Sequence, residues 1–110
     1  MASLAQTQVE VPLPMMQASQ GLVPILADHG FSLLDGSLPG AAELVFAVKR
    51  KAFRNAMQGA ARITDSGTGS LIDLQLDVAP GENKTLLDGR RNRATLEEIA
   101  EQVAARLGRA

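Results

Sequence analysis

The stretch that decides the fold is "LIDLQLDV", residues 71–78, in which apolar and polar side chains alternate. Its even-numbered positions hold isoleucine, leucine, leucine and valine, whereas positions 73, 75 and 77 hold aspartate, glutamine and aspartate. Successive side chains of a β-strand point to opposite faces, so this period predicts a strand with one dry and one wet face. Such a strand is typical of an antiparallel sheet that is covered on one side only. We therefore expect the even-numbered side chains to face helices.

The segments around this strand predict the rest of the sheet. Alternating apolar residues, separated by turn-forming Gly, Pro and Asp, indicate four more strands. These strands are expected within residues 6–13, 31–40, 41–53 and 56–64. The turn cluster "DSGTGS", residues 65–70, joins the last of them to 71–78. Residues 79–94 are expected to form a loop, with a helical turn at 83–87.

Two helices are expected, one early and one at the end of the chain. Residues 14–30 carry apolar side chains at helical spacing, but Pro24 interrupts them, so one kinked helix or two short turns are both open. The last helix is expected to begin at Thr95, which forms a capping-box pair with Glu98, and to end before Gly108.

The resulting order is β-α-β-β-β-β-α, an α+β fold with a twisted antiparallel sheet and two helices packed on one face. Over residues 8–107 this order resembles the plan of helix-grip and TATA-binding-protein-like half-domains. The resemblance lies in element order alone and implies no functional residues. We expect residues 1–7 to be a disordered N-terminus and residues 8–110 to form a single domain.

Composition excludes several kinds of site. The 110 residues include no cysteine, no tryptophan, no tyrosine and one histidine, and the net charge is −1. Disulfides, thiolate metal sites and cysteine nucleophiles are therefore excluded, and a dedicated nucleic-acid binder with a clear basic excess is disfavoured. No export signal and no membrane span are read in the sequence, so a cytoplasmic protein without a membrane partner is expected.

Basic side chains form two clusters. The clusters consist of Lys49, Arg50, Lys51 and Arg54, and of Arg90, Arg91 and Arg93. Alternation along a strand spreads the first cluster over two faces, which suits a solvated hairpin end. The second cluster is expected just before the last helix. Together they offer an alternative function as an anion or nucleic-acid contact, which would weaken steeply with salt.

No catalytic set is visible, so the sequence predicts no enzyme and no cofactor. His29 is the only histidine and is expected at a helix end, where the helix dipole alone favours it. Asp73 and Asp77 share the wet face, but strand rise separates them by about 13 Å, too far for one metal ion.

The wet face also carries apolar residues that predict an interaction surface. The predicted interface residues are Val45, Ala47, Ala60 and Leu71. Mixed patches of this kind are common at partner surfaces. We therefore predict a small non-enzymatic binding or protein-interaction domain that self-associates as a homodimer through the open sheet face.

Another alternative is a carrier that holds a small apolar ligand between sheet and helices. The expected lining residues are Met15, Met16, Leu22, Leu26, Phe46 and Ile99.

Overall fold

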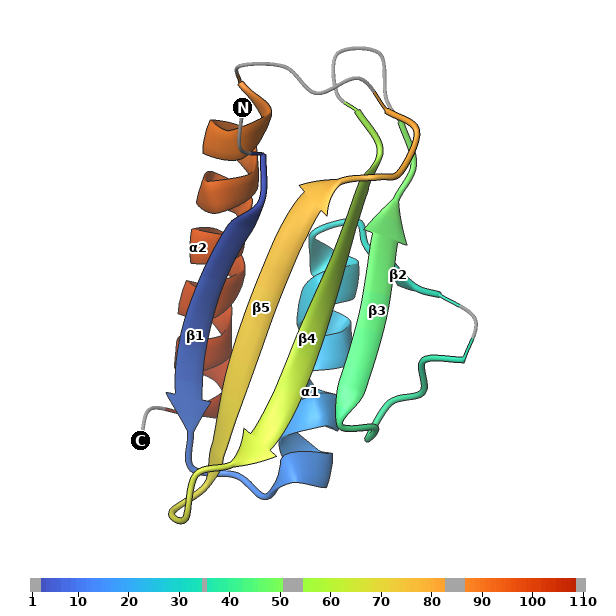
Figure 1. Cartoon of the computed structure of the whole chain (residues 1–110). Coiled ribbons are helices and arrows are strands. Elements are labelled where there is room, and N and C mark those ends of the chain that lie inside the picture. The colour runs from blue at the N-terminus through green and yellow to red at the C-terminus, as the bar shows by residue number, and fades with distance from the viewer. Residues whose placement is uncertain (1–2, 35, 51–54, 83–86, 109–110) are drawn as a thin grey trace.

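The computed structural model describes residues 3–34, 36–50, 55–82 and 87–108, and every structural statement below concerns these residues. They form five strands and two helices (Figure 1). The elements are β1 (Ala5–Val11), α1 (Met15–Asp28), β2 (Ser32–Leu33), β3 (Glu43–Val48), β4 (Met57–Asp65), β5 (Ser70–Val78) and α2 (Asp88–Leu107).

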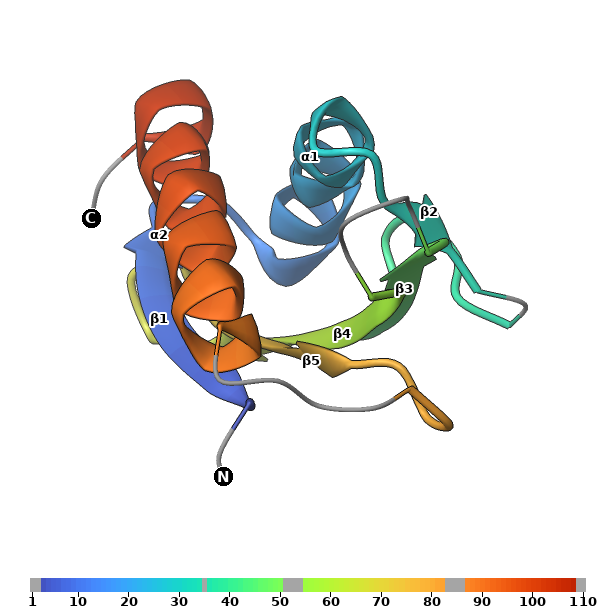
Figure 2. The same cartoon turned by 90° about the horizontal axis from the view of Figure 1, so that it is seen from above.

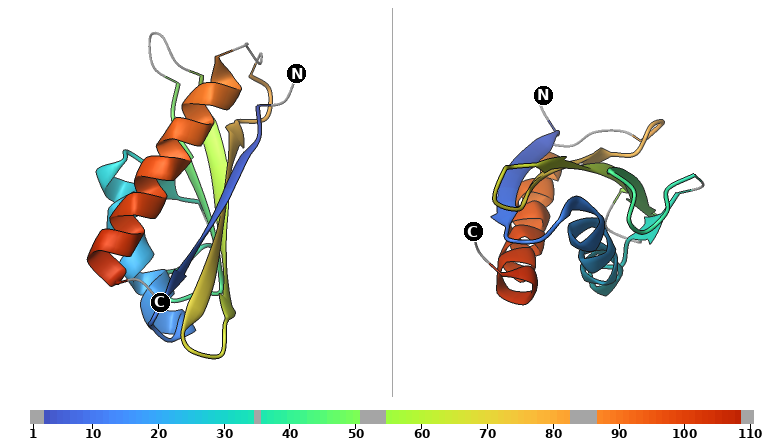
Figure 3. Two further views of the ribbon diagram at one scale, coloured as in Figure 1. Left: turned by 90° about the vertical axis from the view of Figure 1, so that its left-hand side faces the viewer. Right: turned by 90° about the horizontal axis from the view of Figure 1, so that it is seen from below.

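The strands form one antiparallel sheet in the order β1-β5-β4-β3-β2. Both helices lie on the same face of this sheet, which curls around them (Figures 2 and 3). Among the described residues, the other face carries no helix, and it is called the open face below. The predicted α+β fold class and helix-grip order are confirmed. Neither helix is long and apolar enough, within the described part of the chain, to cross a bilayer.

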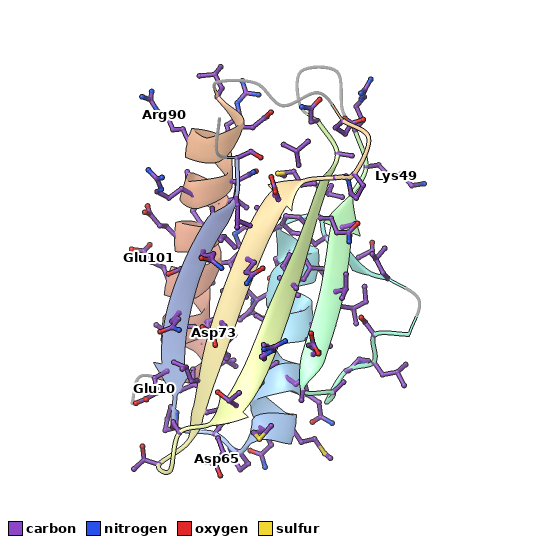
Figure 4. All side chains as sticks on the ribbon, in the orientation of Figure 1. Glu10, Lys49, Asp65, Asp73, Arg90 and Glu101 are labelled. Carbon is purple, nitrogen blue, oxygen red and sulfur yellow. The ribbon has the colours of Figure 1, made fainter. Side chains whose placement is uncertain are left out.

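The side chains of β5 point to the two sheet faces that their alternation predicts. Ile72, Leu74 and Leu76 are fully buried under the helices, whereas Asp73 lies on the open face, turned toward the viewer in Figure 4. The neighbouring β4 follows the same rule, since Ala61 and its odd-numbered neighbours point inward. One buried layer therefore forms between the sheet and the helices.

Phe46 is the largest fully buried side chain of this core. Its ring packs edge-on against Phe31, with ring centroids 5.1 Å apart, and lies over Gly59 on the neighbouring strand. A Cβ atom at Gly59 would stand 2.5 Å from both the Phe46 ring and the Gln75 carbonyl oxygen. Only glycine leaves the room that the ring occupies at this point of β4.

Helix α1 is continuous through Pro24, so the alternative of two short turns does not occur. Pro24 is exposed, which leaves the backbone group that loses its partner near water. The helix ends at Asp28, and two residues later Gly30 adopts a φ of 84° in the left-handed region. The Phe31 amide then donates to the Leu26 carbonyl oxygen.

Two element starts differ from the sequence-based expectation. Strand β1 already begins at Ala5, within the segment expected to be disordered, and Ser3 is buried. Helix α2 begins at Asp88, two turns before the predicted start at Thr95. A buried polar contact explains both, because the Asn92 side chain donates to the Ser3 carbonyl oxygen over 2.8 Å. This bond ties the early turns of α2 to the segment that leads into β1.

The β3 edge of the sheet is closed by local chain rather than by a long strand. Strand β2 pairs with only two residues of β3. Beyond it, the Leu34 amide donates to the Val45 carbonyl over 2.9 Å, and the Val45 amide donates to Ser37 Oγ over 2.8 Å. The backbone groups of Val45 are thereby satisfied without a further strand.

Candidate ligand pocket and open sheet face

A hollow of about 550 Å³ lies at the end of the sheet where β3 and β4 leave it. We call it the end pocket. It is lined by Gly30, Ser32, Leu34, Ala47, Val48, Lys49, Arg50, Ala56, Met57 and Ala79. By strand alternation Ala47 belongs to the open face and Met57 to the helix-covered face, so the pocket reaches around the end of the sheet.

The lining of the end pocket is mostly apolar, with cations at its rim. Arg50 is held by Glu82, which accepts from its Nε over 2.9 Å and from its Nη2 over 2.7 Å. Glu82 also accepts from the Ala56 amide. The bidentate contact raises the pKa of Arg50, and the hydrogen bond from Arg50 lowers the pKa of Glu82 although desolvation opposes it. Lys49 is exposed and has no acidic partner among the described residues.

The space between sheet and helices, which the carrier alternative needs, is filled by side chains. Leu22, Leu26, Phe46 and Ile99 are all fully or almost fully buried members of the core. Met15 packs against that core, whereas Met16 is 62% exposed on the outside of α1. The residues expected to line an internal pocket therefore pack against one another or face solvent.

The open face is organised in rows that run across the strands. One row, called the charged row, consists of Glu43 on β3, Arg62 on β4, Asp73 on β5 and Gln8 on β1. Arg62 Nη2 lies 3.5 Å from a Glu43 carboxylate oxygen, and the Gln8 amide donates to Asp73. Charges of opposite sign therefore alternate along the row.

The neighbouring row, called the small row, consists of Val45, Ala60, Gln75 and Gln6 in the same strand order. Two surface hollows of about 510 and 360 Å³ meet here, and Ala60 and Gln75 line both of them. Ala60 is the short side chain at their meeting point, between Gln58 and Arg62 on the same face of β4.

The structure brings three of the four predicted interface residues together. Val45 lies directly opposite Ala60 in the small row, and Ala47 is the next residue on the same face of β3. Leu71 lies opposite Thr64, on the far side of the charged row. All four predicted residues are half-buried.

The two basic clusters do not form one surface among the described residues. Lys49 and Arg90 stand on opposite flanks of the same end of the molecule (Figure 4). Arg90, Arg91 and Arg93 lie within the first turns of α2, not before it, which corrects the expected position. Lys51 and Arg54 fall outside the described residues.

His29 follows the last residue of α1, as expected. Its Nδ1 lies 3.0 Å from the Ile25 carbonyl oxygen, and its Nε2 lies 3.9 Å from a Glu98 carboxylate oxygen. The first contact lies within the end of α1, and the second reaches α2.

The end pocket was missed in the sequence because its lining comes from four separate segments. The one sequence signal near it was Lys49, which was assigned to a solvated hairpin end. The small residues Ala47, Ala56 and Ala79 become a common wall only once the strands pair.

No protein-family model and no curated protein matches the sequence. Solved structures nevertheless share its fold. DynU16, a protein in the dynemicin biosynthetic locus, has a TM-score of 0.72 at 13% identity, over 96% of this chain and 47% of its own. A START superfamily protein from Mycobacterium smegmatis has a TM-score of 0.70 at 10% identity, over 94% of this chain and 96% of its own.

The di-domain ARO/CYC StfQ from the steffimycin biosynthetic pathway has a TM-score of 0.53 at 12% identity, over 96% of this chain and 48% of its own. The chain thus spans about half the length of DynU16 and StfQ. At these identities the likeness shows a shared helix-grip fold.

These structures correct the prediction that the protein is not an enzyme. That prediction rested on the missing cysteine and the single histidine. The same fold occurs in an ARO/CYC of a biosynthetic pathway, in DynU16 and in CalU16 from Micromonospora echinospora. The prediction is therefore wrong, because the absence of a familiar nucleophilic set does not separate this fold from biosynthetic proteins.

Proposed function

We propose that the protein binds a small, mainly apolar molecule that carries an anionic group, with the apolar part in the end pocket and the anion at Lys49. The observation that carries this proposal is the end pocket itself, a hollow of about 550 Å³ with one unpartnered ammonium among the described residues at its rim. Its volume falls within the roughly 300–1,000 Å³ of small-molecule sites.

The lining supports an apolar ligand that is oriented by few polar groups. Leu34, Ala47 and Met57 offer no hydrogen bonds from their side chains, whereas Ser32 and Lys49 offer a hydroxyl and an ammonium. Arg50 is less suited to the anion, because Glu82 already holds its guanidinium. Lys49 is therefore the cation that a ligand would meet first.

Magnitudes indicate that the apolar part supplies most of the affinity. Each methylene removed from water contributes about 0.8 kcal/mol, whereas an exposed ion pair contributes about 0.2–1 kcal/mol. Affinity should therefore rise with chain length in a series of straight-chain carboxylates, and should fall only modestly when the carboxylate is replaced by a hydroxyl.

The shared fold supports the proposal in general terms. A START superfamily protein has it, as do proteins named for the dynemicin locus and the steffimycin pathway. These neighbours indicate that the arrangement occurs in proteins linked to small-molecule biosynthesis. The site proposed for this chain rests on its own residues.

The test is a titration with dodecanoate, read by amide chemical shifts and by displacement of the fluorescent anion 1-anilinonaphthalene-8-sulfonate. Ala47→Phe fills the end pocket and should weaken binding about tenfold or more, as a lost pocket requires. Thr64→Phe is the matched control, because it adds a ring on the same sheet face outside the pocket. Equal binding by wild type and Ala47→Phe would contradict the proposal.

The role of Lys49 is tested separately. Lys49→Gln should weaken dodecanoate binding by about two- to fivefold and leave dodecanol binding unchanged, since only the ion pair is lost. Arg90→Gln removes an exposed cation on the opposite flank and serves as the control. If dodecanol weakens equally, Lys49 contributes packing rather than charge.

A further inference from the structure

We propose that the open face is a self-complementary interface, in which β4 of one copy packs over β5 of a second copy of this chain. This inference stands on the open face and is independent of the end pocket. It begins with the charged row, in which Arg62 and Asp73 occupy directly paired positions on the two central strands.

Two-fold symmetry converts this pair of positions into two intermolecular contacts. The two-fold axis runs parallel to the strands, between β4 and β5 and in the plane of the interface. It places each row over the same row of the second copy, and β4 over β5 of the second copy. Arg62 then faces Asp73 of the second copy, and Asp73 faces Arg62 of the second copy. At the outer positions of the row, Glu43 faces Gln8 of the second copy, so no like charges meet along it.

The same axis also matches shape in the small row. It places the exposed Gln75 of each copy over Ala60 of the other. Gln75 is a long side chain, and Ala60 lies at the meeting point of the two surface hollows of about 510 and 360 Å³. Each copy therefore presents one projection and one depression at symmetry-related positions.

The other simple face-to-face arrangement is disfavoured by charge. An axis perpendicular to the strands, through the small row, would place Asp73 over Asp77 of the second copy, because the two residues flank Gln75 on the same strand face. Like charges across an interface disfavour association. The geometry therefore selects the arrangement that opposes β4 and β5.

The available area fits a reversible dimer. The four longer strands have six to nine residues each, so about 4.8 Å spacing and about 3.4 Å per residue give a face of roughly 19 by 26 Å, about 500 Å² per copy. A standard interface buries about 800 Å² per partner. Because the sheet curls around the helices (Figure 2), contact concentrates on the central strands, so we expect dissociation in the micromolar range.

The test is a charge swap followed by sedimentation equilibrium up to millimolar concentration. Arg62→Glu and Asp73→Arg should each weaken self-association by about tenfold or more. Each variant places like charges opposite one another at both of the symmetry-related contacts. An equimolar mixture of the two variants should form a heterodimer, since glutamate at 62 then faces arginine at 73 and Asp73 faces Arg62. Arg90→Glu is the charge-matched control away from the face.

Each outcome decides the inference. A heterodimer from two variants that do not self-associate supports the proposed register. Neither loss of folding nor a general charge effect would produce such a heterodimer. Monomeric wild type at millimolar concentration, or a mixture that stays monomeric while both variants melt cooperatively, would overturn it. The dodecanoate titration remains informative in either case, because the end pocket lies outside both rows.

Discussion

Gly59→Ala adds one methyl group where the core has no room for it. The new Cβ atom would lie 2.5 Å from a Phe46 ring carbon and 2.5 Å from the Gln75 carbonyl oxygen. The ring can tilt, but its packing against Phe31 restricts that movement. The carbonyl oxygen belongs to the backbone of β5, so it retreats only if the sheet itself distorts.

The expected loss in the free energy of unfolding follows from these two contacts. Overpacking a core costs typically about 1–3 kcal/mol, and we place this change at the upper end because one of the contacted atoms is backbone. Replacing glycine also restricts the unfolded chain, which offsets about 0.4–1 kcal/mol. We therefore expect the free energy of unfolding to fall by about 2 kcal/mol, or the melting temperature to fall by about 10 °C.

Urea denaturation measures this change, and Gly21→Ala is the matched control. At Gly21 the new Cβ atom would lie 2.6 Å from Cδ2 of Leu107, the far end of a flexible side chain, and alanine favours the helix by about 1 kcal/mol. The control should therefore stay within about 1 kcal/mol of wild type. If Gly59→Ala is equally harmless, the reasoning that Phe46 fills the space above β4 is refuted.

Two further predictions concern contacts at the ends and edge of the sheet. Arg50→Gln should move the pKa of Glu82 up toward its ordinary value, which a carboxyl NMR titration would show. In the wild type the pKa of Glu82 is lower in the folded than in the unfolded state. The stabilisation by the Arg50–Glu82 pair is therefore present above the unfolded-state pKa and should vanish as pH falls through the folded-state pKa. Ser37→Ala should speed hydrogen exchange of the Val45 amide and lower stability by about 0.5–1.5 kcal/mol, and an unchanged exchange rate would show that water replaces the hydroxyl.

The alternation of apolar residues was enough to predict the sheet, because burial on one face imposes a period of two wherever a strand lies. It was not enough to predict the start of α2. Gly89 and the three arginines that follow resemble a loop, and nothing nearby signals a helix. The helix extends through them because Asn92 finds its partner, the Ser3 carbonyl, nearly a whole chain away. Tertiary contact overrides local propensity here.

The candidate sites show the same limit in another form. Alternation assigns Val45, Ala60 and Leu71 to one face, but it does not say which residues stand opposite one another. Pairing register supplies that information, and it separates Leu71 from the other two by the charged row. The end pocket depends even more on register, since its walls come from strands that meet only in the folded sheet.

The filled interior has a consequence for how such a protein can change. The side chains that determine stability, such as Phe46 and Leu74, are enclosed beneath the helices, whereas Leu34, Ala47 and Lys49 lie at the margin of the sheet. Substitutions at these marginal positions would reshape the proposed ligand site while leaving the packed layer untouched. Ligand preference could thus drift among relatives without a matching loss of thermal robustness.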